Sequence, residues 1–289
     1  MASNNDYDPA LEPGTPWHHH PLAIKIGVGI PAILFVLASL VVLAQALKHR
    51  TWCAWALVLA GLYLAFGTYN LNMGYTFDHL MGLGPSLADD KSAMRMMGFI
   101  DLGGILVMQA TLITFSRLVS FLQPSDSALL GKVVVAHVLV SIVNILVALT
   151  LFKPALVKFS PFLELPLYAA VIYLQHAYKQ HVAQWAEQKN AMRLPKAAAS
   201  RPWMNLFYAT RRIAVILAIR AVVGAFCTIT GQFNKDIYFN LLTNQMGLLL
   251  CFWTYCRNFP GWFLPREYTV LIYRGQANDY KSVPLEDMS

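Results

Sequence analysis

The chain has 289 residues, of which 57% are hydrophobic and only 13% are charged, and its formal net charge is +7. A soluble domain carries about 25% charged residues, so the composition excludes a soluble globular protein and predicts an all-α, polytopic membrane protein. The positive charge is expected in the loops, and no lysine–arginine stripe alternates with aromatic residues as in a nucleic-acid surface.

The N-terminal segment, residues 1–21, is polar and acidic. A secretory signal peptide begins with basic residues, so we expect this segment to stay outside the membrane while the first apolar helix acts as the insertion signal. The four cysteines have no CxxC spacing, which supports neither a disulfide framework nor a zinc site. We therefore predict no metal and no cofactor.

Seven apolar stretches each approach the twenty or so residues that a spanning helix needs. They predict a seven-transmembrane helix bundle over residues 22–256, followed by a cytoplasmic tail over 257–289. The stretches are Leu22–Ala46, Cys53–Met73, Met97–Phe121, Lys132–Phe152, Phe162–Tyr178, Ile213–Phe233 and Tyr238–Cys256.

Lysine and arginine are distributed unequally between the two sets of loops. They gather after the first stretch, around the third-to-fourth loop, in the long loop 179–212 and in the tail. Lys153 and Lys158 are the notable exceptions, because they lie in a loop of the other set. Because cytoplasmic loops carry the excess of basic residues, we expect the N-terminus outside and the C-terminus in the cytoplasm. In the loop 179–212, a helical pattern over Gln180–Met192 predicts an extension of the fifth helix.

Arg220 lies about seven residues inside the sixth stretch, or roughly 10–12 Å deep at 1.5 Å per residue. An unpaired arginine near the bilayer centre costs at least about 2.5–3.5 kcal/mol, so it is retained only where the protein supplies acceptors or water. We interpret Arg220 as the central residue of a substrate-binding site. On this interpretation, Arg220→Leu is expected to insert and accumulate almost normally and yet to lose activity.

Five further polar residues are candidates for the same site. Counting from the loop ends places Gln109, Asn144 and Gln245 near mid-depth. The same count places Asp101 and Glu164 nearer the outer face. Gln109 and Asn144 also have a plainer interpretation as interhelical hydrogen bonds, worth about 0.6–2 kcal/mol each. The same count separates Arg220 from Asp101 by about 10 Å, so Asn144 and Gln245 are the expected neighbours of the arginine.

Six short segments form a recognisable series along the chain. Three precede the sixth stretch and three belong to the sixth-to-seventh-helix region: Tyr7-Asp8-Pro9, Gly74-Tyr75, Ile113–Val119, Ile219-Arg220, Asp236-x-Tyr238 and Phe259-Pro260-Gly261. In their order and spacing they resemble the fungal lipid-translocating exporter family, which comprises seven-helix membrane proteins associated with aminocholesterol resistance. The resemblance extends over nearly the whole chain, but each motif is short. It implies a seven-helix protein that moves a lipid-like molecule.

The residues and the resemblance together favour a protein that binds or translocates an amphipathic, lipid-like molecule, rather than an enzyme. In this interpretation Arg220 holds a polar or anionic headgroup. One alternative is a seven-helix receptor whose basic loop 179–212 binds a cytoplasmic partner. Another is a terpene-cyclase-like membrane enzyme that uses Asp101 or Glu164 as a proton donor.

Overall fold

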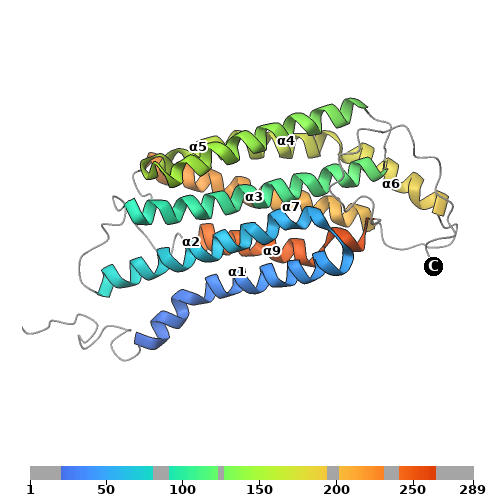
Figure 1. The fold of residues 1–289 in the computed structure, drawn as a ribbon. Coiled ribbons are helices and arrows are strands. Elements are labelled where there is room, and N and C mark those ends of the chain that lie inside the picture. Colours follow the sequence, from blue (N-terminus) through green and yellow to red (C-terminus); the bar gives the residue numbers. More distant parts are fainter. Residues whose placement is uncertain (1–20, 81–90, 123–126, 194–201, 231–240, 265–289) are drawn as a thin grey trace, which may run out of the picture.

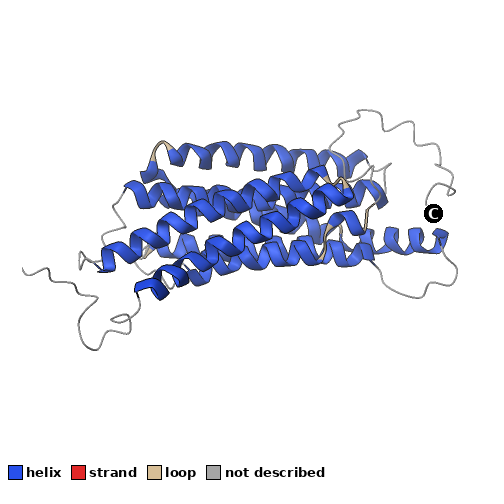
Figure 2. Cartoon of the chain, turned by 60° about the horizontal axis from the view of Figure 1, so that its bottom comes forward, coloured by secondary structure: helices blue, strands red, loops and turns tan. Residues whose placement is uncertain are grey.

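The computed structural model describes residues 21–80, 91–122, 127–193, 202–230 and 241–264. These residues form helices joined by short turns, with no strand among them (Figure 2). Six helical segments are long and apolar enough to cross a membrane: Gly29–His49, Trp52–Asn72, Ala93–Leu122, Gly131–Leu151, Pro154–Ala177 and Trp203–Ile229. For these residues the prediction of an all-α fold is confirmed, and the six candidate spans agree with a multi-pass membrane protein.

The first half of the chain supplies three long helices, each extending beyond its predicted apolar stretch. They are α1 (Pro21–His49), α2 (Trp55–Leu80, preceded by the 3-10 turn η2, Trp52–Ala54) and α3 (Lys91–Leu122). A fourth helix and a run of shorter elements follow: α4 (Ser127–Ala148), the 3-10 segments η4 (Leu149–Leu151) and η5 (Pro154–Phe159), α5 (Ser160–Ala177) and α6 (Lys179–Arg193). Helix α6 agrees with the predicted helical extension after the fifth span.

The last part of the chain contains α7 (Pro202–Ile229), the π-helical segment η6 (Leu241–Met246), α9 (Gly247–Arg257) and the 3-10 turn η7 (Pro260–Trp262). The predicted seventh stretch begins at Tyr238, outside the described residues. Its described part, η6 and α9, packs against α7 and α1. The structure thus identifies six candidate spans, and a seventh remains a prediction.

Helix α3 occupies the centre of the bundle. It lies between α2 on one side and α4 and α5 on the other (Figure 1), and it also contacts α7 and η5. Its side chains are the most buried of the six candidate spans, with 67% of its most apolar window enclosed by the protein. A buried polar side chain on α3 therefore finds its partner either on a neighbouring helix or, as Thr111 and Thr114 do, on a backbone carbonyl of α3 itself.

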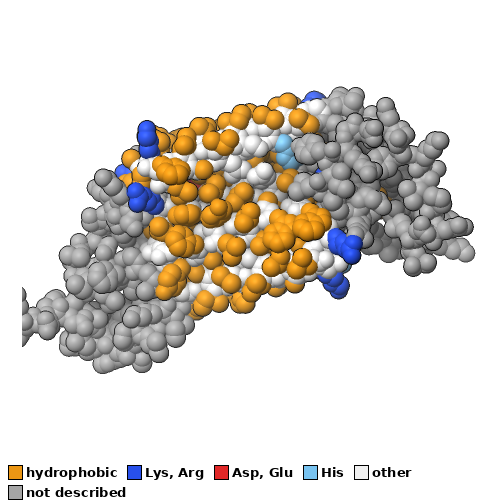
Figure 3. Space-filling model, viewed as in Figure 1, with side chains coloured by type: hydrophobic (Ala, Val, Ile, Leu, Met, Phe, Trp, Pro, Cys, Tyr) orange, Lys and Arg blue, Asp and Glu red, His pale blue; other side chains and the backbone are white. Residues whose placement is uncertain are grey.

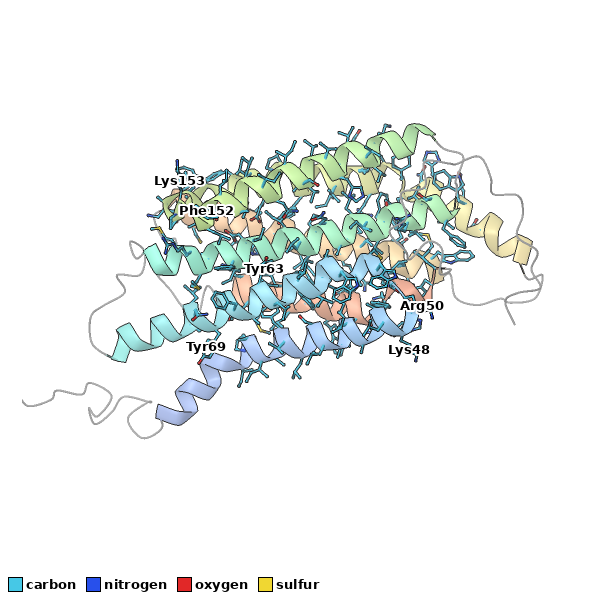
Figure 4. The ribbon with its side chains drawn as sticks, in the orientation of Figure 1. Lys48, Arg50, Tyr63, Tyr69, Phe152 and Lys153 are labelled. Atoms are coloured by element: carbon cyan, nitrogen blue, oxygen red, sulfur yellow. The ribbon has the colours of Figure 1, made fainter. Side chains whose placement is uncertain are left out.

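Helices α1 and α4 lie at the periphery and expose apolar side chains along their length. Figure 3 shows hydrophobic side chains across the middle of the visible face and lysines and arginines at its two ends. In Figure 4, Lys48 and Arg50 mark one end of the bundle and Lys153 marks the opposite end. We refer to these as the Arg50 end and the Lys153 end. An apolar belt between two charged rims is the surface that a lipid bilayer requires.

Close packing of α2 on α3 depends on Gly67. A Cβ at this position would lie 2.8 Å from the backbone oxygen of Met96 and 3.0 Å from Cγ1 of Ile100. A backbone oxygen cannot rotate away as a flexible side chain can, so any larger residue separates the two helices.

We predict that Gly67→Ala lowers the free energy of unfolding by about 1–3 kcal/mol, as overpacking does in other cores. Thermal unfolding of the purified protein in detergent measures this change. The matched control is Gly131→Ala on α4, where a Cβ would meet nothing within 4 Å. That variant should be neutral or slightly stabilised, because alanine favours a helix by about 1 kcal/mol over glycine. Equal melting temperatures for the two variants would contradict the described α2–α3 contact.

Candidate functional site

Arg220 points from α7 into the bundle, where only 6% of its surface is exposed. Its neighbour Ile219 faces outward, so the helix presents an apolar side to the exterior and the guanidinium to the interior. Gly104 on α3 makes room for it, because a Cβ there would lie 2.9 Å from Nη1 of Arg220. The two atoms nearest to that Cβ both belong to the arginine side chain.

Two carboxylates hold the guanidinium. Nη1 of Arg220 donates to Oε2 of Glu164 on α5 at 3.0 Å, and Nη2 donates to Oδ1 of Asp101 on α3. Nε donates to Oδ1 of Asn244 on the π-helical segment η6, at 3.1 Å. Glu164 is 1% exposed and Asp101 is 4% exposed. We call Asp101, Glu164 and Arg220 the buried ion cluster; it joins three helices and the segment before α9.

Two hydroxyl groups orient these carboxylates. Ser160 Oγ donates to Oδ2 of Asp101, and the Tyr168 hydroxyl donates to Oε2 of Glu164 at 3.0 Å. Tyr168 is one helical turn beyond Glu164 on α5, so the two side chains lie on one face of that helix. The second oxygen of Glu164, Oε1, is buried and has no hydrogen-bond partner among the described residues. Glu164 is therefore hydrogen-bonded through one carboxylate oxygen, whereas both oxygens of Asp101 have partners.

The expected 10 Å separation between Arg220 and Asp101 is wrong, because the helices do not begin where the apolar stretches begin. Asp101 lies ten residues after the start of α3 at Lys91, and Glu164 lies ten residues after Pro154, where η5 begins. Arg220 lies nine residues before the end of α7 at Ile229. At 1.5 Å per α-helical residue, Asp101 and Arg220 are about 13–15 Å from the Lys153 end, which is close to half the thickness of a hydrocarbon layer. Glu164 contacts Arg220 and so lies at the same level.

The expected amide neighbours of Arg220 pair elsewhere. Asn144 Nδ2 donates to Oε1 of Gln109 at 2.8 Å, which links α4 to α3. Gln245 and Asn72 exchange two amide hydrogen bonds, of 2.8 and 3.2 Å, between η6 and α2. Gln109 and Asn144 thus have the interhelical role that the plainer interpretation gave them, and Gln245 makes the same kind of bond. The described contacts bring none of the three to the guanidinium.

The structure adds Ser160, Tyr168 and Asn244 to the site. Asn244 directly precedes Gln245 in the π-helical segment, so the two amides point in different directions and reach different partners. Such turns are rare and often occur at functional sites. For Tyr168, the sequence does hold a signal, because its spacing of four residues from Glu164 favours a pair on one face of a helix.

The cluster places one guanidinium against two carboxylates in the interior of a membrane protein. Charges in such surroundings are stable only with close partners and additional hydrogen bonds, and both are present here. The arrangement can hold its own ions, release one carboxylate when another anion takes its place, or accept a proton or a cationic group. Among the described residues, no three histidine, cysteine or acidic side chains come together as a metal site.

Comparison of the chain with protein-family models, with curated proteins and with solved structures finds no match. The geometry of the site itself therefore carries the functional argument.

We predict that Arg220→Leu alone destabilises the protein by roughly 3–5 kcal/mol, because it leaves two buried carboxylates without their cation. This replaces the sequence-based expectation of almost normal accumulation. Adding Asp101→Asn and Glu164→Gln to Arg220→Leu removes the stranded charges and should restore most of the lost stability. Thermal unfolding and the yield of monodisperse protein in detergent measure both effects. If the single variant is as stable as the wild type, Arg220 is not held as described.

Proposed function

We propose that this chain is a seven-helix membrane protein that binds and translocates an amphipathic, lipid-like molecule. We further propose that it is a divergent member of the fungal lipid-translocating exporter family, on the strength of the short segments it shares with that family, of which Ile219-Arg220 contains the central cation of the cluster. In this proposal the segment from Tyr238 to Cys256 forms the seventh span.

The observation that carries the proposal is the buried ion cluster, which ties α3, α5 and α7 together at mid-depth. Stability alone does not require it, because replacing a buried ion pair by well-packed apolar residues is often neutral or stabilising. Ionisable residues inside membrane helices typically mark substrate or ion pathways. A cluster that joins three helices also connects any change in its bonding to the packing of those helices.

The pairing changes the role expected for Arg220. Its guanidinium already faces two carboxylates, so an anionic headgroup reaches it only by replacing one of them. Glu164 is the candidate for release, because Asp101 has partners on both oxygens whereas Oε1 of Glu164 has none among the described residues. A proton on the released Glu164 would remove the charge left behind. We infer that this exchange, and not a permanently open arginine, moves the polar end of the substrate across the bundle.

The two alternatives have less support from the described geometry. A membrane enzyme needs an acid that faces an apolar substrate pocket, but Asp101 and Glu164 both face Arg220. A receptor depends on the basic segment 179–212, whose described parts are α6 and the start of α7, and the buried ion cluster lies outside this segment.

We predict that Glu164→Gln folds but moves lipid at least about tenfold more slowly than the wild type. The amide keeps the shape of the side chain and can still accept a hydrogen bond from Arg220, while the exchangeable charge is lost. Fluorescent, headgroup-labelled phospholipids in proteoliposomes measure the rate, because dithionite bleaches only the labels in the outer leaflet.

The matched control is Glu187→Gln on α6, which removes an exposed carboxylate outside the cluster. It should leave the rate unchanged. Tyr168→Phe, which removes the hydroxyl bond to Glu164, should give an intermediate rate. If Glu164→Gln moves lipid at the wild-type rate, the buried ion cluster does not take part in lipid movement and the proposed mechanism is wrong.

We predict that the two termini lie on opposite sides of the membrane, with residues 1–21 outside. Single cysteines placed within 2–15 and within 277–289 test this arrangement with a membrane-impermeant maleimide on intact cells. The N-terminal sites should react directly, and the C-terminal sites should react only after permeabilisation. Native cysteines add little background, because three of the four are buried. Labelling of both ends from the same side would exclude an odd number of spans.

A further inference from the structure

A groove of about 590 Å³ lies between α7 and α9. Three arginines, Arg211, Arg212 and Arg257, line one part of it, and Val215, Leu250 and Trp253 line another. None of the described residues that line it is acidic. The groove shares no residue with the buried ion cluster.

Helix geometry separates the charged part of the groove from its apolar part. On α7, Val215 follows Arg211 by four residues, and on α9, Leu250 precedes Arg257 by seven. Residues at these spacings share a helix face. The two helices run in opposite directions, so the beginning of α7 and the end of α9 meet at the Arg50 end. The arginines therefore gather at that end, and the apolar side chains lie one to two turns deeper, about 6–10 Å further into the bundle.

The side chains are free to meet a ligand. Arg212 and Arg257 are exposed, Arg211 is half-buried, and 66% of Trp253 is exposed. The acidic residues with described side chains lie elsewhere: Asp101 and Glu164 pair with Arg220, and Glu187 is on α6. Three arginines around one groove thus present guanidinium groups without a carboxylate from the residues that line it.

We propose that this groove binds an anionic phospholipid of the bilayer, with its phosphate among the three arginines and its acyl chains along Val215, Leu250 and Trp253. Guanidinium groups form paired hydrogen bonds with phosphate oxygens, which makes arginine well suited to a phosphate ligand. Basic pockets between membrane helices bind lipid headgroups on the side where anionic lipids are enriched. The order of charge followed by apolar surface matches the order of headgroup and chain in a phospholipid.

The site is separate from the proposed translocation step. A lipid that stays in the groove and is never moved satisfies this inference, and movement of a lipid through the cluster does not require the groove. The two proposals therefore fail independently.

The fluorescence of Trp253 reports whether a lipid occupies the groove. The protein is reconstituted in vesicles that contain either brominated phosphatidylglycerol or brominated phosphatidylcholine at equal mole fraction, since bromine quenches nearby tryptophan fluorescence. Subtracting the signal of the Trp253→Phe variant isolates the emission of Trp253 from that of the other six tryptophans. We expect the anionic lipid to quench Trp253 more strongly than the zwitterionic lipid at low mole fraction.

Replacing Arg211, Arg212 and Arg257 together by glutamine should remove this preference, and Arg212→Gln or Arg257→Gln alone should weaken the apparent affinity about fivefold each. If the triple variant does not fold, Arg212→Gln and Arg257→Gln, at two exposed positions, test the same prediction singly. Lys48→Gln, on an exposed lysine at the same end but on α1, should leave the preference intact. Glu164→Gln should also leave it intact even where lipid movement is lost.

Two results would overturn the proposal. Equal quenching by the two lipids in the wild type would show that the groove does not select an anionic phospholipid, as expected if another part of the chain fills it. A preference that survives the loss of all three arginines would place the anionic lipid elsewhere on the protein.

Discussion

The guanidinium of Arg220, shared between Asp101 and Glu164, is the interaction on which the bundle depends. Hydrocarbon offers no water to an ion, so an arginine at mid-depth requires acceptors from the protein itself. Those acceptors come from α3 and α5, and a third contact comes from Asn244. Segments far apart in the sequence are thereby fixed at one depth and in one rotation about their axes.

Several local features follow from this constraint. Gly104 leaves space for the guanidinium on the central helix, and Ser160 at the start of α5 reaches Asp101 because η5 carries the chain into the bundle before the α-helix begins. On α7, Gly224 allows Pro161 to approach closely, since a Cβ there would lie 3.0 Å from the proline ring. The π-helical segment η6 directs Asn244 to Arg220 and Gln245 to Asn72. Small residues and irregular turns accordingly occur where helices meet the cluster.

Helix α7 carries two sets of arginines with different surroundings. Arg220 is enclosed and paired, whereas Arg211 and Arg212 lie two to three turns earlier at the Arg50 end, beside an open groove. A paired, buried arginine suits an exchange of partners inside the bundle, and exposed arginines above an apolar wall suit a lipid at the membrane surface. The two sets of arginines on this helix thus belong to two separate proposals, lipid movement through the buried ion cluster and lipid binding in the groove.

The sequence by itself determined the class of protein, because its apolar stretches and low charge fit only a membrane environment. It also identified Arg220, Asp101 and Glu164 as residues that need an explanation, since ionisable groups are costly in hydrocarbon wherever they lie. The tertiary structure decided which of them meet. The apolar stretches did not show that α3 begins at Lys91 or that η5 enters the bundle at Pro154, and these positions set the depths of the two acids. Likewise, the pairing of Gln109 with Asn144 and of Gln245 with Asn72 depends on how the helices are rotated against one another, which a single chain's hydropathy does not encode.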